Sequence, residues 1–142
     1  MRRGLVISLI VCGSCVSMAG CGEISEASLP ERPTAADVQE LVFTTACATS
    51  GCHSEPTFAG DLDLSAASTS HEALVDTEPT NRVARNLGLI RVVPGDPDSS
   101  FLFRKLTEPG TGEGAPMPSS QTRLTAPYVD LVARWISQGA VP

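Results

Sequence analysis

The stretch Cys47-Ala48-Thr49-Ser50-Gly51-Cys52-His53 organises this chain, because it places two thiols and an imidazole close together in the sequence. Thiolates form covalent bonds, and imidazole nitrogens bind metal ions. Four residues separate the two cysteines, so a local bulge is needed to aim both sulfur atoms at one target. Gly51 tolerates the backbone angles that such a bulge requires. The stretch is therefore the first candidate for a covalent or metal-binding site.

The shorter form of this pattern, C-x-x-C-H, is the attachment signature of c-type haem. In that signature the cysteines form thioethers with the haem vinyl groups, and the histidine becomes an axial iron ligand. The wider spacing seen here is a variant that occurs in c-type cytochromes. The stretch thus predicts haem c as the cofactor, and the rest of the chain can be compared with that prediction.

Residues 1–20 form a predicted lipoprotein signal peptide. A basic start at Arg2 and Arg3 precedes an apolar run that is too short to span a bilayer as a helix. The following run, Met18-Ala19-Gly20-Cys21, resembles the bacterial lipobox, with Met18 where leucine is usual. The resemblance implies a lipid on Cys21, which would anchor the protein to a membrane of the cell envelope, facing the periplasm or the surface. An ordinary signal peptide cleaved nearby, or a retained anchor, is the alternative.

Cysteine usage supports this organisation. The chain has five cysteines, of which Cys12 and Cys15 leave with the leader and Cys21 carries the lipid. Only Cys47 and Cys52 remain in the mature protein. Export permits both covalent haem attachment and stable disulfide formation, so the same pair also predicts a disulfide.

Size and charge limit the remaining function classes. The chain has 142 residues and a net charge of −6, so one small acidic domain over residues 34–142 is expected, behind a lipidated tether over residues 21–33. An acidic chain lacks the basic face that nucleic-acid binding needs. An acidic surface is compatible with a redox partner protein that has a basic docking face. Aromatic residues make up only 4%, which predicts a thin core that a buried macrocycle would fill.

Two helices are strongly indicated near the ends of the domain. Thr34 with Asp37 resembles a helix-capping arrangement, and apolar residues at helical spacing continue that helix to about Thr45. At the other end, Thr125 is a predicted cap, and Gly139 ends the helix. The last helix has one apolar stripe, formed by Tyr128, Leu131, Val132, Trp135 and Ile136. We expect this stripe to pack on the first helix.

The middle of the domain has weaker signals. A short helix is expected from Ser68 or Ser70 through Val75, and a strand or extended segment from Leu87 to Val93. Asp96 and Pro97 predict the start of a helix that covers Ser99 to Leu106. The run from Thr107 to Thr122 is rich in glycine and proline and should be irregular.

Met117 is the only methionine of the mature chain, and it lies between Pro116 and Pro118 in this irregular loop. Proline fixes the backbone on both sides and lowers the entropy cost of presenting the sulfur. The sequence therefore predicts Met117 as the distal iron ligand, and a Met filling a gap in the core is the alternative. His71 is the other candidate for that position, unless it is a solvated helix residue. Three arginines are candidates to pair with haem propionates: Arg82, Arg85 and Arg91.

Four segments together resemble the cytochrome c-like domains of planctomycete and myxobacterial surface proteins. They are the runs Cys47–His53, Val93–Leu102 with its PGDP-S-hydrophobic pattern, Ala115–Pro118, and Arg134–Ala140 with its W-I-x-x-G-A pattern. The resemblance covers about residues 35–140. It implies a mostly α fold around one haem, with the N- and C-terminal helices packed together. It also implies roles for four residues: Cys47 and Cys52 in attachment, His53 as proximal ligand and Met117 as distal ligand.

Three functional hypotheses follow from these patterns. The first is a membrane-anchored monohaem electron carrier that catalyses no reaction of its own. The second is a haem-free lipoprotein domain with a Cys47–Cys52 disulfide, acting as a structural or interaction module. The third is a haem subunit of a larger oxidoreductase or peroxidase, with an open or His71-ligated iron. A zinc site is disfavoured, because the spacing of the two cysteines and two histidines is not that of a zinc finger.

Overall fold

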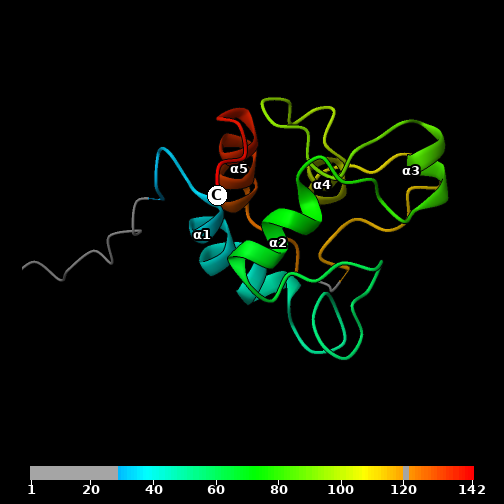
Figure 1. The fold of residues 1–142 in the computed structure, drawn as a ribbon, viewed down its shortest axis with the longest axis horizontal. Helices are drawn as coiled ribbons and strands as arrows, with labels where there is room; N and C mark the ends of the chain where they lie inside the picture. The colour runs from blue at the N-terminus through cyan, green and yellow to red at the C-terminus, as the bar shows by residue number, and fades with distance from the viewer. Residues whose placement is uncertain (1–28, 120–121) are drawn as a thin grey trace, which may run out of the picture.

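The computed structural model describes residues 29–119 and 122–142. In this part the chain is mostly helical, which confirms the predicted α class (Figure 1). The elements in order are α1 (Ala35–Val38), η1 (Gln39–Cys47), α2 (Ala67–Leu74), α3 (Arg82–Asn86), α4 (Phe101–Leu106) and α5 (Ala126–Ser137). The predicted leader, the lipidation site Cys21 and most of the predicted tether lie outside the described residues.

The first helix begins where its capping signal predicted. The Thr34 hydroxyl accepts a hydrogen bond from the Asp37 amide (3.4 Å), and the Asp37 carboxylate accepts one from the Thr34 amide (2.8 Å). Helix α1 continues directly into the π-helix η1, which ends at Cys47. A π-helix is rare and is frequently found at functional sites. The sequence pattern predicted the helix but not its widening before Cys47.

Helix α5 provides the other half of the core. It follows Thr125, has Pro127 in its first turn, and ends before Gly139, whose φ of 97° is left-handed. Its buried face consists of Leu131, Val132, Trp135 and Ile136. These residues belong to the same apolar cluster as Val38 and Val42 of the first helix. Helices α1 and α5 are in contact, as the sequence predicted.

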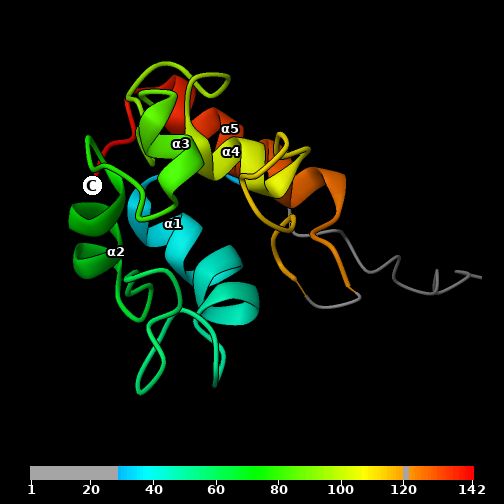
Figure 2. The same ribbon diagram turned by 90° about the vertical axis from the view of Figure 1, so that its right-hand side faces the viewer.

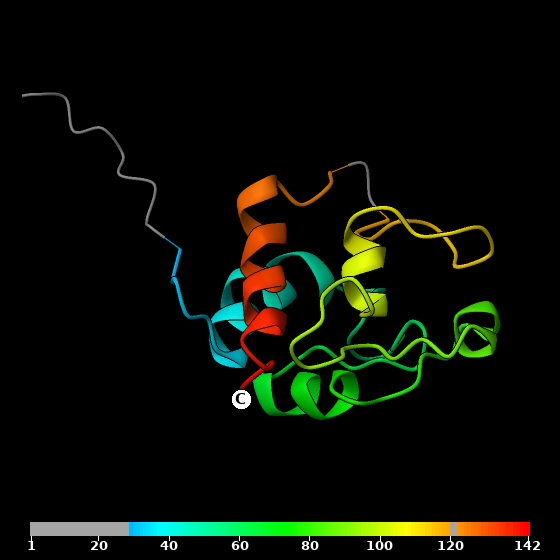
Figure 3. The same ribbon diagram turned by 90° about the horizontal axis from the view of Figure 1, so that it is seen from above.

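Backbone carbonyls near the C-terminus fasten three elements together. The Val141 carbonyl accepts hydrogen bonds from the Ala35 amide (3.0 Å) and from the Trp135 indole (2.8 Å). The Ala140 carbonyl pairs with Nε2 of His71 in α2 at 2.8 Å. The C-terminus therefore lies beside the start of α1, where the views of Figures 1 and 3 place it.

The middle of the chain agrees less closely with the sequence expectations. The expected strand or extended segment Leu87–Val93 is only partly present, because Leu87 and Gly88 form the turn that ends α3. The rest forms only isolated bridges, of which Val75 with Val92 and Ile90 with Ser100 are parallel. Helix α4 begins at Phe101 rather than Ser99, because Asp96 accepts from the Ser99 amide (3.1 Å) and holds a separate turn. Helix α4 then contacts α5 (Figure 2).

Helix α3 was not predicted. It is capped by Asn81, whose side-chain oxygen accepts from the Ala84 amide at 2.9 Å. The helix has five residues. The side chains of Arg82 and Arg85 on it are exposed. Across the described ranges, no helix is long and apolar enough to cross a membrane.

Candidate functional site

The Cys47–His53 stretch forms a closed turn at the end of η1. The His53 amide donates to the Cys47 carbonyl (3.1 Å), and the Cys52 amide donates to the Thr49 carbonyl (2.9 Å). Gly51 has a φ of 83°, which only glycine adopts without strain. The turn therefore accommodates the four residues between the cysteines and brings the His53 amide back to the Cys47 carbonyl.

The two thiols of this turn are free and differ in burial. Cys47 is 9% exposed, whereas Cys52 is half-buried. Burial and, to a smaller extent, the nearby Cys52 together raise the pKa of the Cys47 thiol to about 12. The thiols are thus within electrostatic range of each other. This proximity is compatible with attachment to one macrocycle and also with a disulfide.

The His53 ring has an unusual environment. Its Nδ1 atom is buried without a hydrogen-bond partner. Burial lowers the pKa of His53, the nearby cations Arg91 and Lys105 lower it further, and the Ala59 backbone opposes this shift. The ring is consequently neutral at pH 7, which is the form that binds a metal ion.

The loop after His53 is held by backbone carbonyls and one arginine. The Leu64 amide donates to the His53 carbonyl at 2.8 Å, which fixes the far end of the loop. Arg91 is only 8% exposed and donates to the carbonyls of Gly60 (3.2 Å), Asp61 (3.1 Å) and Ala73 (2.8 Å). These contacts give Arg91 a role in fastening the loop to α2.

Met117 lies half-buried on the loop that follows α4, which runs beside that helix in Figure 3. The Met117 amide donates to the Lys105 carbonyl at 2.6 Å. The Lys105 ammonium donates in turn to the carbonyls of Glu113 (3.0 Å) and Ala115. Lys105 therefore holds the loop at three residues: Glu113, Ala115 and Met117.

The same lysine relates the two halves of the predicted site. Its ammonium is close enough to His53 to lower the pKa of that ring, and its carbonyl holds Met117. The structure thus brings Cys47, Cys52 and His53 together in one turn, whereas Met117 lies on a separate loop that Lys105 holds.

His71 has a different environment. Its Nε2 is paired with the Ala140 carbonyl, and its ring meets Trp135 edge-on with centroids 6.3 Å apart. The side chain is half-buried rather than solvated, so the expectation of a solvated helix residue was wrong. Both contacts tie His71 to the C-terminal end of the core.

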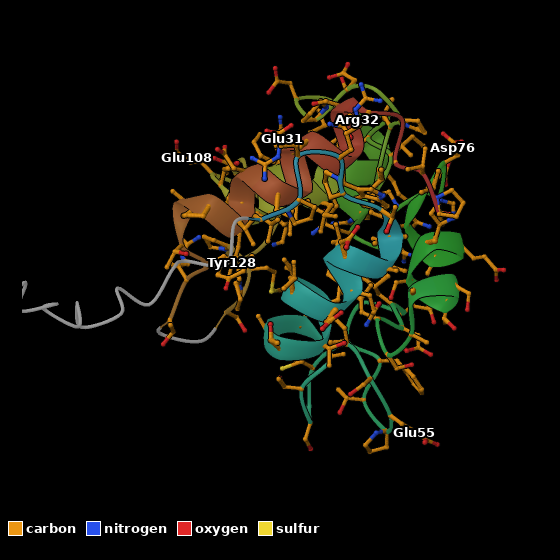
Figure 4. The ribbon with its side chains drawn as sticks, turned by 90° about the vertical axis from the view of Figure 1, so that its left-hand side faces the viewer. Glu31, Arg32, Glu55, Asp76, Glu108 and Tyr128 are labelled. Carbon is orange, nitrogen blue, oxygen red and sulfur yellow. The ribbon has the colours of Figure 1, made fainter. Side chains whose placement is uncertain are left out.

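Several large apolar side chains are only partly buried against the core. They come from η1, α4, α5 and the neighbouring segments: Leu41, Leu62, Leu102, Phe103, Leu124 and Tyr128. In Figure 4, Tyr128 lies at the first turn of α5, and Glu55 marks the tip of the loop after His53. A shallow cavity of about 570 Å³ adjoins the Met117 loop and is lined by Thr107, Glu108, Pro109, Gly114, Pro116 and Arg123.

These features fit a covalently bound porphyrin. The turn offers two free thiols beside an imidazole whose Nδ1 has no partner, and partly exposed apolar side chains pack against the core cluster to which Cys47 belongs. A cluster of three or more His, Cys, Asp or Glu side chains that could hold a bare metal ion is absent from residues 29–119 and 122–142.

Comparisons of the chain with protein-family models, with curated proteins and with solved structures found no match. The functional assignment therefore depends on the chain's own residues.

Sequence reasoning missed three residues that hold the site segments: Arg91, Lys105 and Glu113. Arg91 was considered as a propionate partner or a solvated surface residue, and not as a residue that fastens a loop. Glu113 stands between Gly112 and Gly114, and a charged residue flanked by two glycines is the one signal that could have drawn attention to it.

Proposed function

We propose that this protein is a membrane-anchored monohaem c-type cytochrome that carries electrons in the bacterial cell envelope. Cys47 and Cys52 would attach the haem, His53 would be the proximal ligand and Met117 the distal ligand. One observation carries the proposal: the turn returns His53 to the Cys47 carbonyl despite the four-residue spacer. The anchor would be the lipid on Cys21.

The bound haem would supply a reversible one-electron couple, whose potential the protein tunes. The chain's own residues prepare the site. Burial keeps the His53 ring neutral, so that its nitrogen lone pair is available at pH 7. A thioether from Met117 would close the sixth position, which favours electron transfer over oxygen chemistry. No catalysis by the chain itself is proposed.

The charge of the protein suggests how it would meet its partner. A net charge of −6 would favour a redox protein with a basic docking face. Salt screens such attraction, so the rate of electron exchange with that partner should fall as ionic strength rises.

The decisive experiment is to export the protein in a host with a haem-attachment system and to record its mass and visible spectrum. A haem-sized mass increment that survives denaturation, with a low-spin spectrum, supports the proposal. His53→Ala should abolish the low-spin spectrum, whereas Met117→Ala should retain the haem and open the sixth position. A colourless protein after such export would refute the proposal.

The same measurement distinguishes the other two functions. A colourless protein two protons lighter than the reduced chain would carry a Cys47–Cys52 disulfide. The position of both cysteines in one turn is compatible with that outcome, which would make the domain a structural or interaction module. A haem protein whose unmutated form binds cyanide or carbon monoxide would instead be a subunit of a larger oxidoreductase or peroxidase.

A further inference from the structure

Glu113 is a buried carboxylate in a loop rich in glycine and proline, and it is flanked by Gly112 and Gly114. It is 2% exposed. Both its oxygens are engaged by Arg104 of α4, with Nη2 to Oε1 at 2.5 Å and Nε to Oε2 at 3.2 Å. The Gly110 amide donates to Oε2 at 2.8 Å. A buried charge is tolerated only with such partners, so its pairing fixes the loop geometry around it.

The neighbouring helix residue continues this anchoring toward Met117. The Lys105 ammonium donates to the carbonyls of Glu113 and Ala115, and the Lys105 carbonyl accepts from the Met117 amide. Two consecutive residues of α4 thus hold the segment 110–117 at several points along its length. We call this set of contacts the α4 clasp: Arg104, Lys105 and Glu113 with the loop groups they bind.

The glycines of the segment allow the backbone to come this close. A Cβ atom on Gly110 would lie 3.1 Å from the Arg104 guanidinium and 3.1 Å from the Glu113 carboxylate. On Gly114, which also has a φ of 85°, it would lie 3.3 Å from the Lys105 ammonium. A side chain at either position would require these clasp groups to shift by a few tenths of an ångström.

We propose that Glu113 is a positioning residue for Met117: through the α4 clasp it fixes where the loop presents the Met117 sulfur. This inference rests on the proposed function, in which Met117 is the distal iron ligand. The Met117 thioether is uncharged, and it lies on a loop without regular secondary structure. Ordering the loop in advance removes an entropy cost that ligation would otherwise have to meet.

The test compares two single-charge variants of the same loop. Glu113→Gln keeps the side-chain shape but loses the paired charge. Glu108→Gln makes the same chemical change at an exposed position that projects from the surface in Figure 4. Lys105→Met is a second variant that disrupts the clasp. It removes the hydrogen bonds from the ammonium to the loop carbonyls and keeps the apolar part of the side chain.

Two readouts are needed, one of which requires no haem. The first is hydrogen exchange of the Met117 amide, which we expect to be at least about tenfold faster in Glu113→Gln and Lys105→Met than in the unmutated protein, because the clasp protects it. The second is the affinity of the reduced haem protein for carbon monoxide, which competes with Met117. It should rise by about tenfold or more in the same variants. Glu108→Gln should change neither quantity by more than about twofold.

Each outcome decides one step. Unchanged exchange at Met117 in a folded Glu113→Gln protein would refute the clasp, whether or not haem is bound. Faster exchange with unchanged carbon monoxide affinity would show that the clasp orders the loop without positioning the sulfur, and the proposal would fall. A wild-type protein without haem would refute the proposed function and the ligand role together, and the exchange measurement would still show whether Glu113 anchors the loop.

Discussion

The helical frame of α1, η1 and α5 and the two site segments, residues 48–65 and 107–119, are held in different ways. The frame is stabilised by buried apolar side chains, including Val38, Val42, Leu131 and Trp135, each at most 1% exposed. The site segments contribute little to that cluster, and most of their residues are exposed or half-buried.

The segments are fastened instead by a few charged side chains. Arg91 binds the loop after His53, while Arg104 and Lys105 bind the Met117 loop. Non-directional apolar burial therefore sets the fold, and directional hydrogen bonds set the positions of the site residues. Removing a large buried side chain of the frame should destabilise the whole fold most, whereas changes to the fastening residues should alter the site segments in a folded protein.

The largest expected effect is in the frame. Trp135→Ala removes a side chain that is 1% exposed and should lower the free energy of unfolding by about 3–5 kcal/mol. Urea denaturation followed by circular dichroism measures this. Ser137→Ala, at an exposed position of the same helix, is the control and should change stability by no more than about 0.5 kcal/mol. A small loss in Trp135→Ala would contradict the division between frame and segments.

Arg91→Met should have the next largest effect. It removes hydrogen bonds to three backbone carbonyls, and the expected cost is about 2–3 kcal/mol. Urea denaturation of Arg91→Met and of the exposed variant Arg85→Met gives the comparison, and the latter should be near neutral. Equal stability of the two variants would show that Arg91 does not fasten the loop.

Glu113→Gln should cost about 1–2 kcal/mol near neutral pH. Pairing with Arg104 lowers the pKa of Glu113 below its ordinary value of 4.5. The pair therefore stabilises the fold fully above about pH 4.5, and this contribution is lost as pH falls through the lowered pKa. The stability difference between the unmutated protein and Glu113→Gln should accordingly shrink from about pH 6 to about pH 3. A difference independent of pH would contradict the ion pair.

The smallest expected effect comes from the capping box of α1. Thr34→Ala removes the hydroxyl that accepts from the Asp37 amide and should cost about 1 kcal/mol. Thermal unfolding measures the loss, and Thr34→Ser, which keeps the hydroxyl, should restore most of it. Because the change is in the frame, hydrogen exchange at Met117 should stay the same in this variant.

The sequence predicted the parts of the fold that depend on local signals. Thr34 with Asp37, and the stripe that contains Trp135, are short-range patterns whose physical basis lies within one helix. The start of α4 was misplaced, because Asp96 caps a turn instead of the helix. Helix α3 was missed, since five residues are too few to show a periodic pattern.

Of the candidate site, the sequence predicted only the reactive residues and not the residues that hold them in place. Cys47, Cys52 and His53 are adjacent in sequence, so their clustering could be expected, and the structure adds the turn that closes it. The fastening roles of Arg91, Lys105 and Glu113 depend on carbonyls and side chains that are distant in the sequence or in an irregular loop. No spacing rule encodes such contacts, because they arise only when the chain is folded.

The bond between the Ala35 amide and the Val141 carbonyl has a consequence for the order in which the protein is built. The first and last helices emerge from the ribosome at opposite ends of synthesis, yet neither has a packed core without the other. Cys47 belongs to the same apolar cluster as Leu131 and Trp135, so it stays accessible until α5 has been delivered. An enzyme that modifies this thiol would therefore have to act before α5 docks, because the folded cluster buries the thiol.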